Sequence, residues 1–445
     1  MKRLLMRFGA AAILLTVVAC SDRTQPPTPV QKPMAQASRS AGAVSVSGPG
    51  AVRPDEADTS KGLYNANTDA PTPQPQGEFD LAPNPTGMRD LNSLAFSRLL
   101  GIGWNLGNAL EAVDTTTNTR DETIWGNPRV NRQLLQAVAD AGFKTVRLPV
   151  AWSEFSDPAN FVIAESRMAR VEQVVNDILD TGMYVMLNMH WDGGWMQPTE
   201  AQRDPVNGRL AIMWRQIANH FRDYDDRLLF AGTNEVMVEG DYGTPSPEYY
   251  RVQNSFNQTF VDAVRATGGR NAYRYLVIQG FNTNIDHTVN FATLPADRVD
   301  NRLLMEVHFY DPYEFALTED TRYWQWGKIA TDNTLKAAWP AETAGSDEAF
   351  VDSKMKLMEE KYIRQGIGVI LGEYGAVRKD TVDPKGVYRT YWVEYVTRSA
   401  IAHGLVPVYW DNGYPNDDYS FGLFDRHSGA QVHTAIIDAI IKAAR

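Results

Sequence analysis

The fold is decided by one stretch of sequence, Leu228-Leu229-Phe230-Ala231-Gly232-Thr233-Asn234-Glu235, whose pattern is repeated in Gly368-Val369-Ile370-Leu371-Gly372-Glu373-Tyr374-Gly375. Each stretch begins as an apolar run typical of a buried strand and reaches a glutamate near its end. An apolar strand that delivers an acid at its C-terminal end suits the active-site mouth of a barrel enzyme. Two such acids suggest a general acid and a nucleophile acting on a glycosidic bond.

Similar apolar runs recur along the chain, and stretches with helical periodicity separate them. The eight predicted strands are Ile102–Asn108, Lys144–Val150, Tyr184–Trp191, Leu228–Glu235, Tyr275–Gly280, Leu304–Asp311, Gly368–Gly375 and Val406–Gly413. Helices are predicted between or after them at Asn131–Ala141, Arg167–Asp180, Ser246–Thr267, Phe350–Arg364 and Ala430–Ala444. The runs are continuously apolar, as in parallel strands covered by helices. Strand then helix, eight times, predicts an α/β fold, a single (β/α)8 barrel.

A doubly wound open sheet is the competing fold. It favours a glycine-rich phosphate turn after the first strand, and Gly101-Ile102-Gly103-Trp104-Asn105-Leu106-Gly107 superficially resembles one. Its glycines lie before and within the predicted strand, however, and not in the turn that follows it. We therefore prefer the barrel.

The N-terminus predicts export. Residues 1–19 combine a basic start with a short apolar segment, as in a secretory signal peptide. The segment ends Leu15-Thr16-Val17-Val18-Ala19-Cys20, which resembles a bacterial lipobox and implies lipidation of Cys20. An ordinary signal peptide with a chance cysteine is the alternative. Ser21 follows the cysteine, and in a Gram-negative host this resembles sorting to the outer membrane, with the protein anchored there or at the cell surface.

Residues 20–85 have a different composition from the rest of the chain. Eleven of the 24 prolines fall there, among many Ser, Thr, Ala, Gly and Gln. Such a segment buries too little apolar surface to offset its ordering entropy, so we predict a disordered tether. A small binding module is the alternative, but it would have only Tyr64 and Phe79 as aromatic residues. Residues 86–445 then form the catalytic domain.

Composition excludes several classes of function. The formal net charge of −11 argues against nucleic acid as a partner. Cys20 is the only cysteine, so the mature chain has no internal disulfide, thiolate metal site or thiol nucleophile if that residue is lipidated. The histidines are not paired at metal-ligand spacing, and there is no Ser-His-Asp elbow. We expect a monomer that needs no cofactor or metal.

Polar and aromatic residues collect at the predicted C-terminal strand ends. In a barrel these ends share one mouth. A single strand-end His or Arg is usually structural, but nine such positions spread over seven of the eight strands favour an active site. They are Asn108, Arg147, His190, Asn234, Glu235, His308, Tyr310, Glu373 and Trp410.

These positions lie in motifs that resemble glycoside hydrolase family 5, a family of retaining barrel glycosidases. The motifs are Gly103-Trp104-Asn105-Leu106-Gly107-Asn108, Val146-Arg147-Leu148-Pro149, Asn188-Met189-His190, Asn234-Glu235, His308-Phe309-Tyr310-Asp311-Pro312-Tyr313, Gly372-Glu373-Tyr374-Gly375 and Tyr409-Trp410-Asp411-Asn412. They run in the family's order and cover nearly all of residues 101–424.

The resemblance implies a role for each glutamate. Glu235 would be the general acid/base, which protonates the leaving oxygen and then activates water. Glu373 would be the nucleophile. Tyr310 would donate a hydrogen bond to that nucleophile, and Arg147 would add positive charge on the same side.

The resemblance also implies roles for the neighbouring side chains. His308 would lie near the acid/base, and Asn234 would bind the sugar 2-hydroxyl. His190 and Trp410 would form the floor of the central subsite. Two positions depart from the usual pattern: Val236 stands where many relatives have proline, and Trp191 where many have a second histidine.

The aromatic residues predict a sugar substrate. The chain has eleven tryptophans, and flat aromatic faces pack on the apolar faces of sugar rings. About half of the tryptophans should belong to the core. We expect Trp410, Trp195, Trp326 and Asn108 to bind substrate. The motifs are similar to those of bacterial endo-β-1,4-glucanases acting on cellulose-type glucan, xyloglucan or mixed-linkage glucan. The alternatives are an endo-β-1,4-mannanase and a surface glycan-binding lipoprotein without activity.

Overall fold

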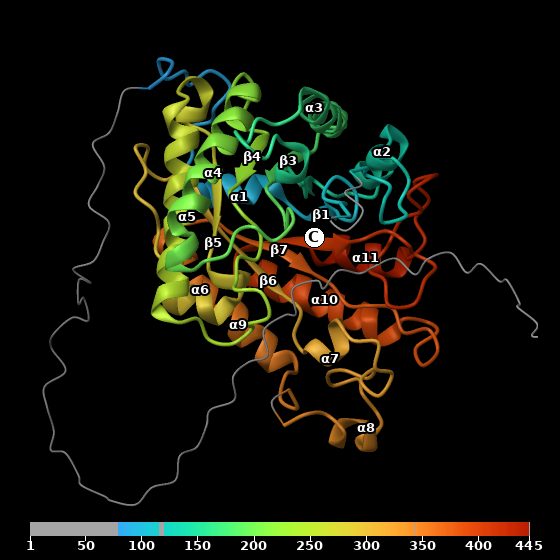
Figure 1. The fold of residues 1–445 in the computed structure, drawn as a ribbon. Coiled ribbons are helices and arrows are strands. Elements are labelled where there is room, and N and C mark those ends of the chain that lie inside the picture. Colours follow the sequence, from blue (N-terminus) through green and yellow to red (C-terminus); the bar gives the residue numbers. More distant parts are fainter. Residues whose placement is uncertain (1–78, 115–119, 342, 445) are drawn as a thin grey trace, which may run out of the picture. The chain divides into compact units, whose positions relative to one another are not determined.

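A computed structural model describes residues 79–114, 120–341 and 343–444, and the barrel predicted from the sequence is confirmed (Figure 1). Eight parallel strands form a closed barrel in which each strand pairs with its sequence neighbours and β8 closes on β1. The strands are β1 (Gly103–Leu106), β2 (Thr145–Leu148), β3 (Tyr184–Asn188), β4 (Leu228–Ala231), β5 (Leu276–Gln279), β6 (Leu303–Phe309), β7 (Val369–Tyr374) and β8 (Leu405–Asp411). Each of them lies inside its predicted range or starts one residue before it.

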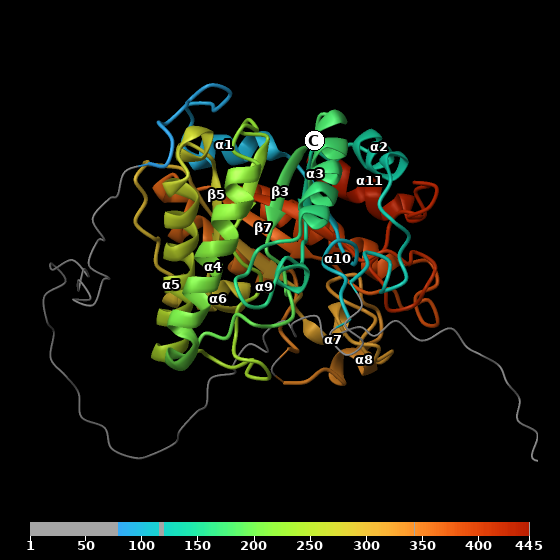
Figure 2. The same cartoon turned by 45° about the horizontal axis from the view of Figure 1, so that its top comes forward.

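Helices surround the barrel (Figure 2). They are α1 (Ser93–Leu100), α2 (Arg132–Asp140), α3 (Glu165–Asp180), α4 (Glu200–His220), α5 (Pro247–Ala266), α6 (Ile285–Phe291), α7 (Tyr313–Ala316), α8 (Asn333–Ala337), α9 (Glu348–Lys361), α10 (Val387–Ala402) and α11 (Thr434–Ala443). The five predicted helices correspond to α2, α3, α5, α9 and α11. Ser246 caps α5 as expected, because its hydroxyl accepts from the Tyr249 N–H and Pro247 occupies the first turn.

The longest helix, α4, was not predicted from the sequence. It contains both Pro205 and Gly208, which are normally poor helix formers. Its buried residues nevertheless recur at helical spacing and include Leu210, Trp214 and Ile217. The indole N–H of Trp214 donates to the Gly232 carbonyl at 3.0 Å, so α4 packs directly on the end of β4.

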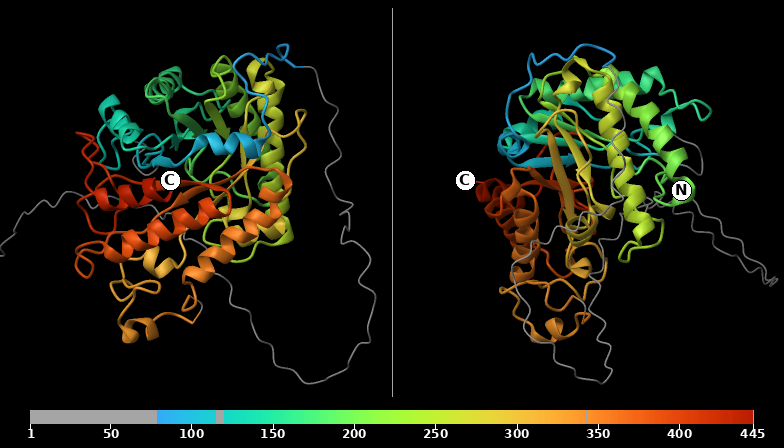
Figure 3. Two further views of the ribbon diagram at one scale, coloured as in Figure 1. Left: turned by 180° about the vertical axis from the view of Figure 1, so that it is seen from behind. Right: turned by 90° about the vertical axis from the view of Figure 1, so that its left-hand side faces the viewer.

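The core has two parts. The larger part lies between the strands and the surrounding helices. The smaller part fills the barrel and its N-terminal end, where α1 lies across the opening (Figure 3). Phe96 of α1 stacks on Tyr275 at 3.6 Å between ring centroids. Because α1 closes that end, only the C-terminal end of the barrel is left for an active site.

The packed domain begins before the predicted boundary at residue 86. The Asp80 N–H donates to the Ala266 carbonyl at 2.8 Å, and the Asn84 N–H donates to the Gly269 carbonyl at 2.9 Å. The Arg298 guanidinium lies 5.2 Å from the ring centroid of Phe79. These contacts join residues 79–85 to the barrel, so the predicted tether is shorter by at least seven residues. The rest of the tether and the signal segment lie outside the described residues.

Candidate active site

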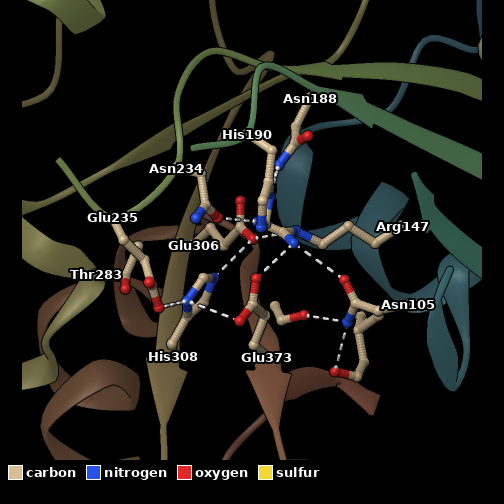
Figure 4. Close-up of polar contacts among 12 residues, drawn as sticks. Asn105, Arg147, Asn188, His190, Asn234, Glu235, Thr283, Glu306, His308 and Glu373 are labelled. Carbon is tan, nitrogen blue, oxygen red and sulfur yellow. Dashed lines mark hydrogen bonds and ion pairs between the residues drawn. The ribbon is translucent and has the colours of Figure 1, made fainter. Parts of the chain in front are cut away.

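Glu235 and Glu373 meet at the C-terminal end of the barrel. Glu235 follows β4 with a positive φ of 47°, and Glu373 lies in β7 where the pairing with β6 and β8 shifts register. Such a bulge re-aims a strand side chain. Oxygens of the two carboxylates and a ring nitrogen of His308 all lie within 4.8 Å of one another. Figure 4 shows His308 between the two acids. The spacing matches the close pair of a retaining glycosidase, about 5–5.5 Å, and not the wider inverting pair.

Glu373 is surrounded by donors. Arg147 contacts one carboxylate oxygen at 2.7 Å, and the Tyr310 hydroxyl donates to the other at 3.0 Å. Burial, followed by the carboxylates of Glu373 and Glu235, raises the pKa of Tyr310 well above its ordinary value. The phenol therefore keeps its proton and remains a donor. These contacts hold the Glu373 carboxylate in a fixed position between two hydrogen-bond donors, which suits a nucleophile.

Glu235 occupies a different environment. His308 Nδ1 lies 2.7 Å from its carboxylate, and its backbone N–H donates to the side-chain oxygen of Gln279 at 3.2 Å. Burial and the negative charge of Glu373 raise the pKa of Glu235, and His308 opposes that shift only in part. A carboxyl with a raised pKa next to an ionised partner is suited to proton transfer.

His308 also contacts Glu306, a residue that the sequence analysis did not identify. His308 Nε2 lies 3.2 Å from the Glu306 carboxylate, which also receives a hydrogen bond from Gln279 at 2.9 Å. Burial alone would raise the pKa of Glu306, but Arg147 and His308 outweigh it and lower the pKa to about 2. Burial likewise opposes protonation of His308, yet Glu373, Glu235 and Glu306 raise its pKa to about 9. Glu306 and His308 are two residues apart on β6, so alternation predicts that both face inward.

Arg147 connects the two sides of the site. Its guanidinium is fully buried, and it lies 2.7 Å from Glu306 as well as from Glu373. It also donates to the side-chain oxygens of Asn234 at 2.5 Å and Asn105 at 3.0 Å. Asn105 in turn donates to the Gly372 carbonyl at 2.8 Å, beside the nucleophile. The arginine therefore fixes the positions of two acids and two amides at once.

His190 and Trp410 form a stacked pair. Figure 4 shows where His190 lies in the site. The two rings lie 5.7 Å apart at an interplanar angle of 6°. Burial, followed by the charge of Arg147, lowers the pKa of His190 well below 6.5, so the ring is neutral. Asn188 contacts its Nδ1 at 3.1 Å and orients it. The Trp410 indole N–H is buried without a hydrogen-bond partner in the described structure.

The other three predicted substrate contacts differ in position. Asn108 follows β1 with a positive φ of 54°, is partly exposed, and donates its N–H to the Glu111 carboxylate. Trp195 is partly exposed in the loop after β3, and Arg209 lies 4.3 Å from its ring centroid.

Trp326 does not lie on the cleft. It is only 2% exposed, packs against Phe315, Tyr391 and Tyr395, and donates its N–H to the Ser346 carbonyl. The expectation that Trp326 binds sugar is therefore wrong. A tryptophan in a loop after a strand can still belong to the core when that loop packs on a later helix, as Trp326 does on Tyr391 and Tyr395 of α10.

Glu235, His308 and Glu373 are the only cluster of potential metal ligands close enough to hold an ion in the described part of the chain. Their surroundings do not favour a cation. The Arg147 guanidinium contacts Glu373 directly, and His308 already contacts both acids and Glu306. A positive group at this distance offsets the negative charge that would attract a metal ion, and it would repel the ion itself.

Comparisons with known proteins agree with this geometry. A family model described as cellulase (glycosyl hydrolase family 5) matches residues 109–416. A xyloglucan-specific endo-β-1,4-glucanase from Bacteroides ovatus is 42% identical over 379 residues, which cover 81% of this chain and 72% of that protein.

Two solved structures are similar as well. A Bacteroides ovatus family 5 xyloglucanase, in complex with a XXXG heptasaccharide, superposes with a TM-score of 0.76 at 40% identity. The match covers 85% of this chain and 84% of that chain. A broad-specificity endoglucanase from Bacteroides salanitronis superposes with a TM-score of 0.73 at 38% identity. The match covers 82% of this chain and 98% of that chain.

Proposed function

Because the chain belongs to family 5 of the glycosyl hydrolases, the cellulase family, we propose that it cleaves internal β-1,4 bonds of a β-glucan by double displacement, with Glu235 as acid/base and Glu373 as nucleophile. The observation that carries the proposal is the asymmetry of the two acids. Arg147 and Tyr310 contact Glu373, whereas Glu235 contacts His308 and has a raised pKa.

In the first step, an oxygen of Glu373 bonds to the anomeric carbon as the bond to the leaving oxygen breaks. The proton of the Glu235 carboxyl passes to that leaving oxygen. Formation of the new ester removes the negative charge of Glu373. After burial, that charge is the largest cause of the raised pKa of Glu235. Glu235 is therefore stabilised as a carboxylate once it has given up its proton.

In the second step, the Glu235 carboxylate takes a proton from water while the water oxygen bonds to the anomeric carbon. The bond to Glu373 breaks, and both acids return to their starting states. Two inversions at one carbon retain the β-configuration. Asn234, held by Arg147 at 2.5 Å, is positioned to bind the 2-hydroxyl of the sugar.

The substrate class follows from the relatives. Similar proteins include a xyloglucan-specific enzyme and a broad-specificity endoglucanase. We propose a β-1,4-glucan backbone, with xyloglucan among the accepted substrates. Reducing-sugar release and product analysis on carboxymethylcellulose, xyloglucan, lichenan and mannan test this. Cleavage of mannan alone would instead support a mannanase.

The catalytic roles are tested with two variants. Glu373→Gln should lower kcat by at least about 10⁴-fold and still bind glucan, because it removes the nucleophile and keeps its shape. Glu235→Ala should recover turnover in azide on substrates with good leaving groups and release a β-glycosyl azide. An α-azide would contradict double displacement.

We further propose that the protein is exported and lipid-anchored through Cys20. This residue lies outside the described part of the chain, and no helix within that part is long and apolar enough to span a bilayer. The basic start, apolar segment and lipobox-like sequence support the proposal. Radiolabelled palmitate should enter the wild-type chain and not Cys20→Ser, and the variant should leave the membrane fraction. Equal labelling of both would refute the anchor.

A further inference from the structure

A second cavity, of about 120 Å³, lies away from the proposed catalytic residues. We call it the flank pocket. It is bounded by the segment after β7 (residues 377–386), the first turn of α10 and the start of α11. A single water needs about 10–15 Å³ of such volume, so the pocket has room for about ten waters or for one ligand of monosaccharide size. None of the residues assigned to catalysis lines it.

Arg389 forms the inner wall of the flank pocket. The residue is only 4% exposed, and its Nη2 donates to the Tyr409 hydroxyl at 3.0 Å. Its Nε has no hydrogen-bond partner in the described structure. An unpaired buried donor is costly, and a guanidinium is built to bind a carboxylate through two N–H groups. The wall therefore presents an incompletely satisfied cation.

The other charges around the pocket leave it positive. Arg378, Lys379, Lys385 and Arg389 line the pocket together with Asp380 and Asp383, so four cations and two carboxylates give a formal charge of +2 in a chain of net charge −11.

Both acids of the flank pocket are already engaged. Asp380 pairs with Arg378, and Asp383 accepts the N–H groups of Val387 and Tyr388 at 2.9 Å each. Two of the cations are engaged as well. Arg378 pairs with Asp380 and donates from Nη1 to the Pro415 carbonyl, and Lys379 Nζ donates to the carbonyls of Glu314, Asp320 and Tyr323. Lys385 lies on the exposed rim.

His433 also lines the pocket and does not add charge. Burial, followed by the positive charge of Arg389, lowers its pKa below 6.5, and its Nε2 lies 2.7 Å from the Pro415 carbonyl. The ring is therefore a neutral donor to that carbonyl. His433 and Arg389 both line the pocket.

The remaining lining is apolar and aromatic. Trp324 is partly exposed at the pocket, where Phe315, Val377 and Ile436 complete the apolar surface. The Trp324 ring meets Tyr388 edge-on at 5.2 Å and 86°, which fixes its orientation. An aromatic face beside cations suits a ligand that is a ring with apolar C–H groups and also carries negative charge.

We propose that the flank pocket binds a hexuronate, with its pyranose ring against Trp324 and its carboxylate on Arg389 and Arg378. A neutral hexose would bring no negative charge to Arg389 and Arg378. A bare phosphate would leave the aromatic wall unused. This site is separate from the cleft that holds Glu235 and Glu373, and it requires no chemistry of its own.

Calorimetric titration of the full chain with D-glucuronate, D-glucose and inorganic phosphate tests the proposal. Glucuronate should bind at least tenfold more tightly than either of the other two. Arg389→Gln should weaken glucuronate binding at least tenfold, and Trp324→Leu about as much. Lys385→Glu changes only an exposed rim residue, so it should fold normally, keep full glucanase activity and weaken glucuronate binding at least threefold.

The Glu373→Gln protein separates this site from the cleft. It should bind glucuronate as the wild type does, even when a cello-oligosaccharide saturates the cleft. Equal binding of glucose and glucuronate would overturn the proposal, and so would phosphate binding as tight as that of glucuronate. The proposal would also be overturned if the affinity for glucuronate were unchanged in Lys385→Glu and also unchanged in either Arg389→Gln or Trp324→Leu. Each result is independent of whether the enzyme cleaves glucan.

Discussion

Glu306 is the residue on which both halves of the site depend. It contacts Arg147 at 2.7 Å and His308 Nε2 at 3.2 Å, and these two side chains contact Glu373 and Glu235 respectively. Its described hydrogen bonds and ion pairs are with Arg147, His308 and Gln279, and none is with Glu235 or Glu373. Glu306 is therefore a positioning residue, which aligns the nucleophile and the acid/base through their partners.

Glu306→Gln should lower kcat by about 100-fold and change KM little, because misplacement of catalytic groups costs about this much. The variant should also shift the pH–rate profile, since the Glu306 hydrogen bond is one cause of the raised pKa of His308. Kinetics across pH check both effects. Glu348→Gln, on a partly exposed glutamate at the start of α9, is the control and should match the wild type. A profile unchanged in shape would mean that Glu306 has a purely structural role.

At the scale of the element, β7 shows how a strand is adapted to carry a nucleophile. Its pairing shifts register around Glu373, and Gly372 lies against Glu306. A side chain on Gly372 would overlap the Glu306 carboxylate. Glycine is thus required at this point because the buried acid of β6 occupies the space of a Cβ atom.

Gly372→Ala should destabilise the protein by about 1–3 kcal/mol, the usual cost of overpacking a filled site, and should reduce activity by displacing Glu306. Gly208→Ala is the matched control. Gly208 lies within α4 with nothing within 4 Å of an added Cβ, so alanine should stabilise the helix by about 0.5–1 kcal/mol. Denaturant unfolding of both variants checks the signs. Equal effects would show that the Glu306 contact does not constrain β7.

Sequence pattern predicted the strands better than the helices. The strands are buried on both faces, so their continuous apolar runs identify them directly. Helix α4 carries Pro205 and Gly208 and mixes polar with apolar residues, and its stability comes from packing on β4 and α5 rather than from local propensity. The prediction for Trp326 fails for a related reason, since residues far along the chain, such as Tyr395, bury that ring.

For the molecule as a whole, buried acids set the response of stability to pH. Burial raises the pKa of Glu111, Asp192 and Asp311 to about 7. Between about pH 4 and pH 7 the folded state therefore holds protons that the unfolded state has released, and stability falls as pH rises. Glu306 acts in the opposite direction: its lowered pKa of about 2 contributes stability that is lost as pH falls from about 4.5 towards 2.

The thermal midpoint should therefore be highest near pH 4 and lower at pH 8 by at least about 2 °C. Asp192→Asn should reduce that difference, because it removes one of the three titrations while it keeps an oxygen to accept the N–H groups of Ser153 and Trp195. Asp223→Asn, at an acid that is 89% exposed, should leave the difference unchanged. Calorimetric scans from pH 3 to pH 9 measure it. A midpoint that rises steadily to pH 8 would show that these acids ionise freely in the folded protein.

The sequence by itself determined the barrel, the family and the candidate acids, because buried parallel strands and their end residues are local, ordered features of the chain. Glu235, Glu373, Arg147 and His308 could all be located as strand-end residues. Only the tertiary structure brought in Glu306, Gln279 and Asn105, since their partners come from other strands of the closed barrel. The tertiary structure also shows that Trp326 lies in the core and that the flank pocket is lined by segments that follow three different strands. Contacts between distant segments depend on how the barrel closes and how its loops pack, and no local pattern encodes them.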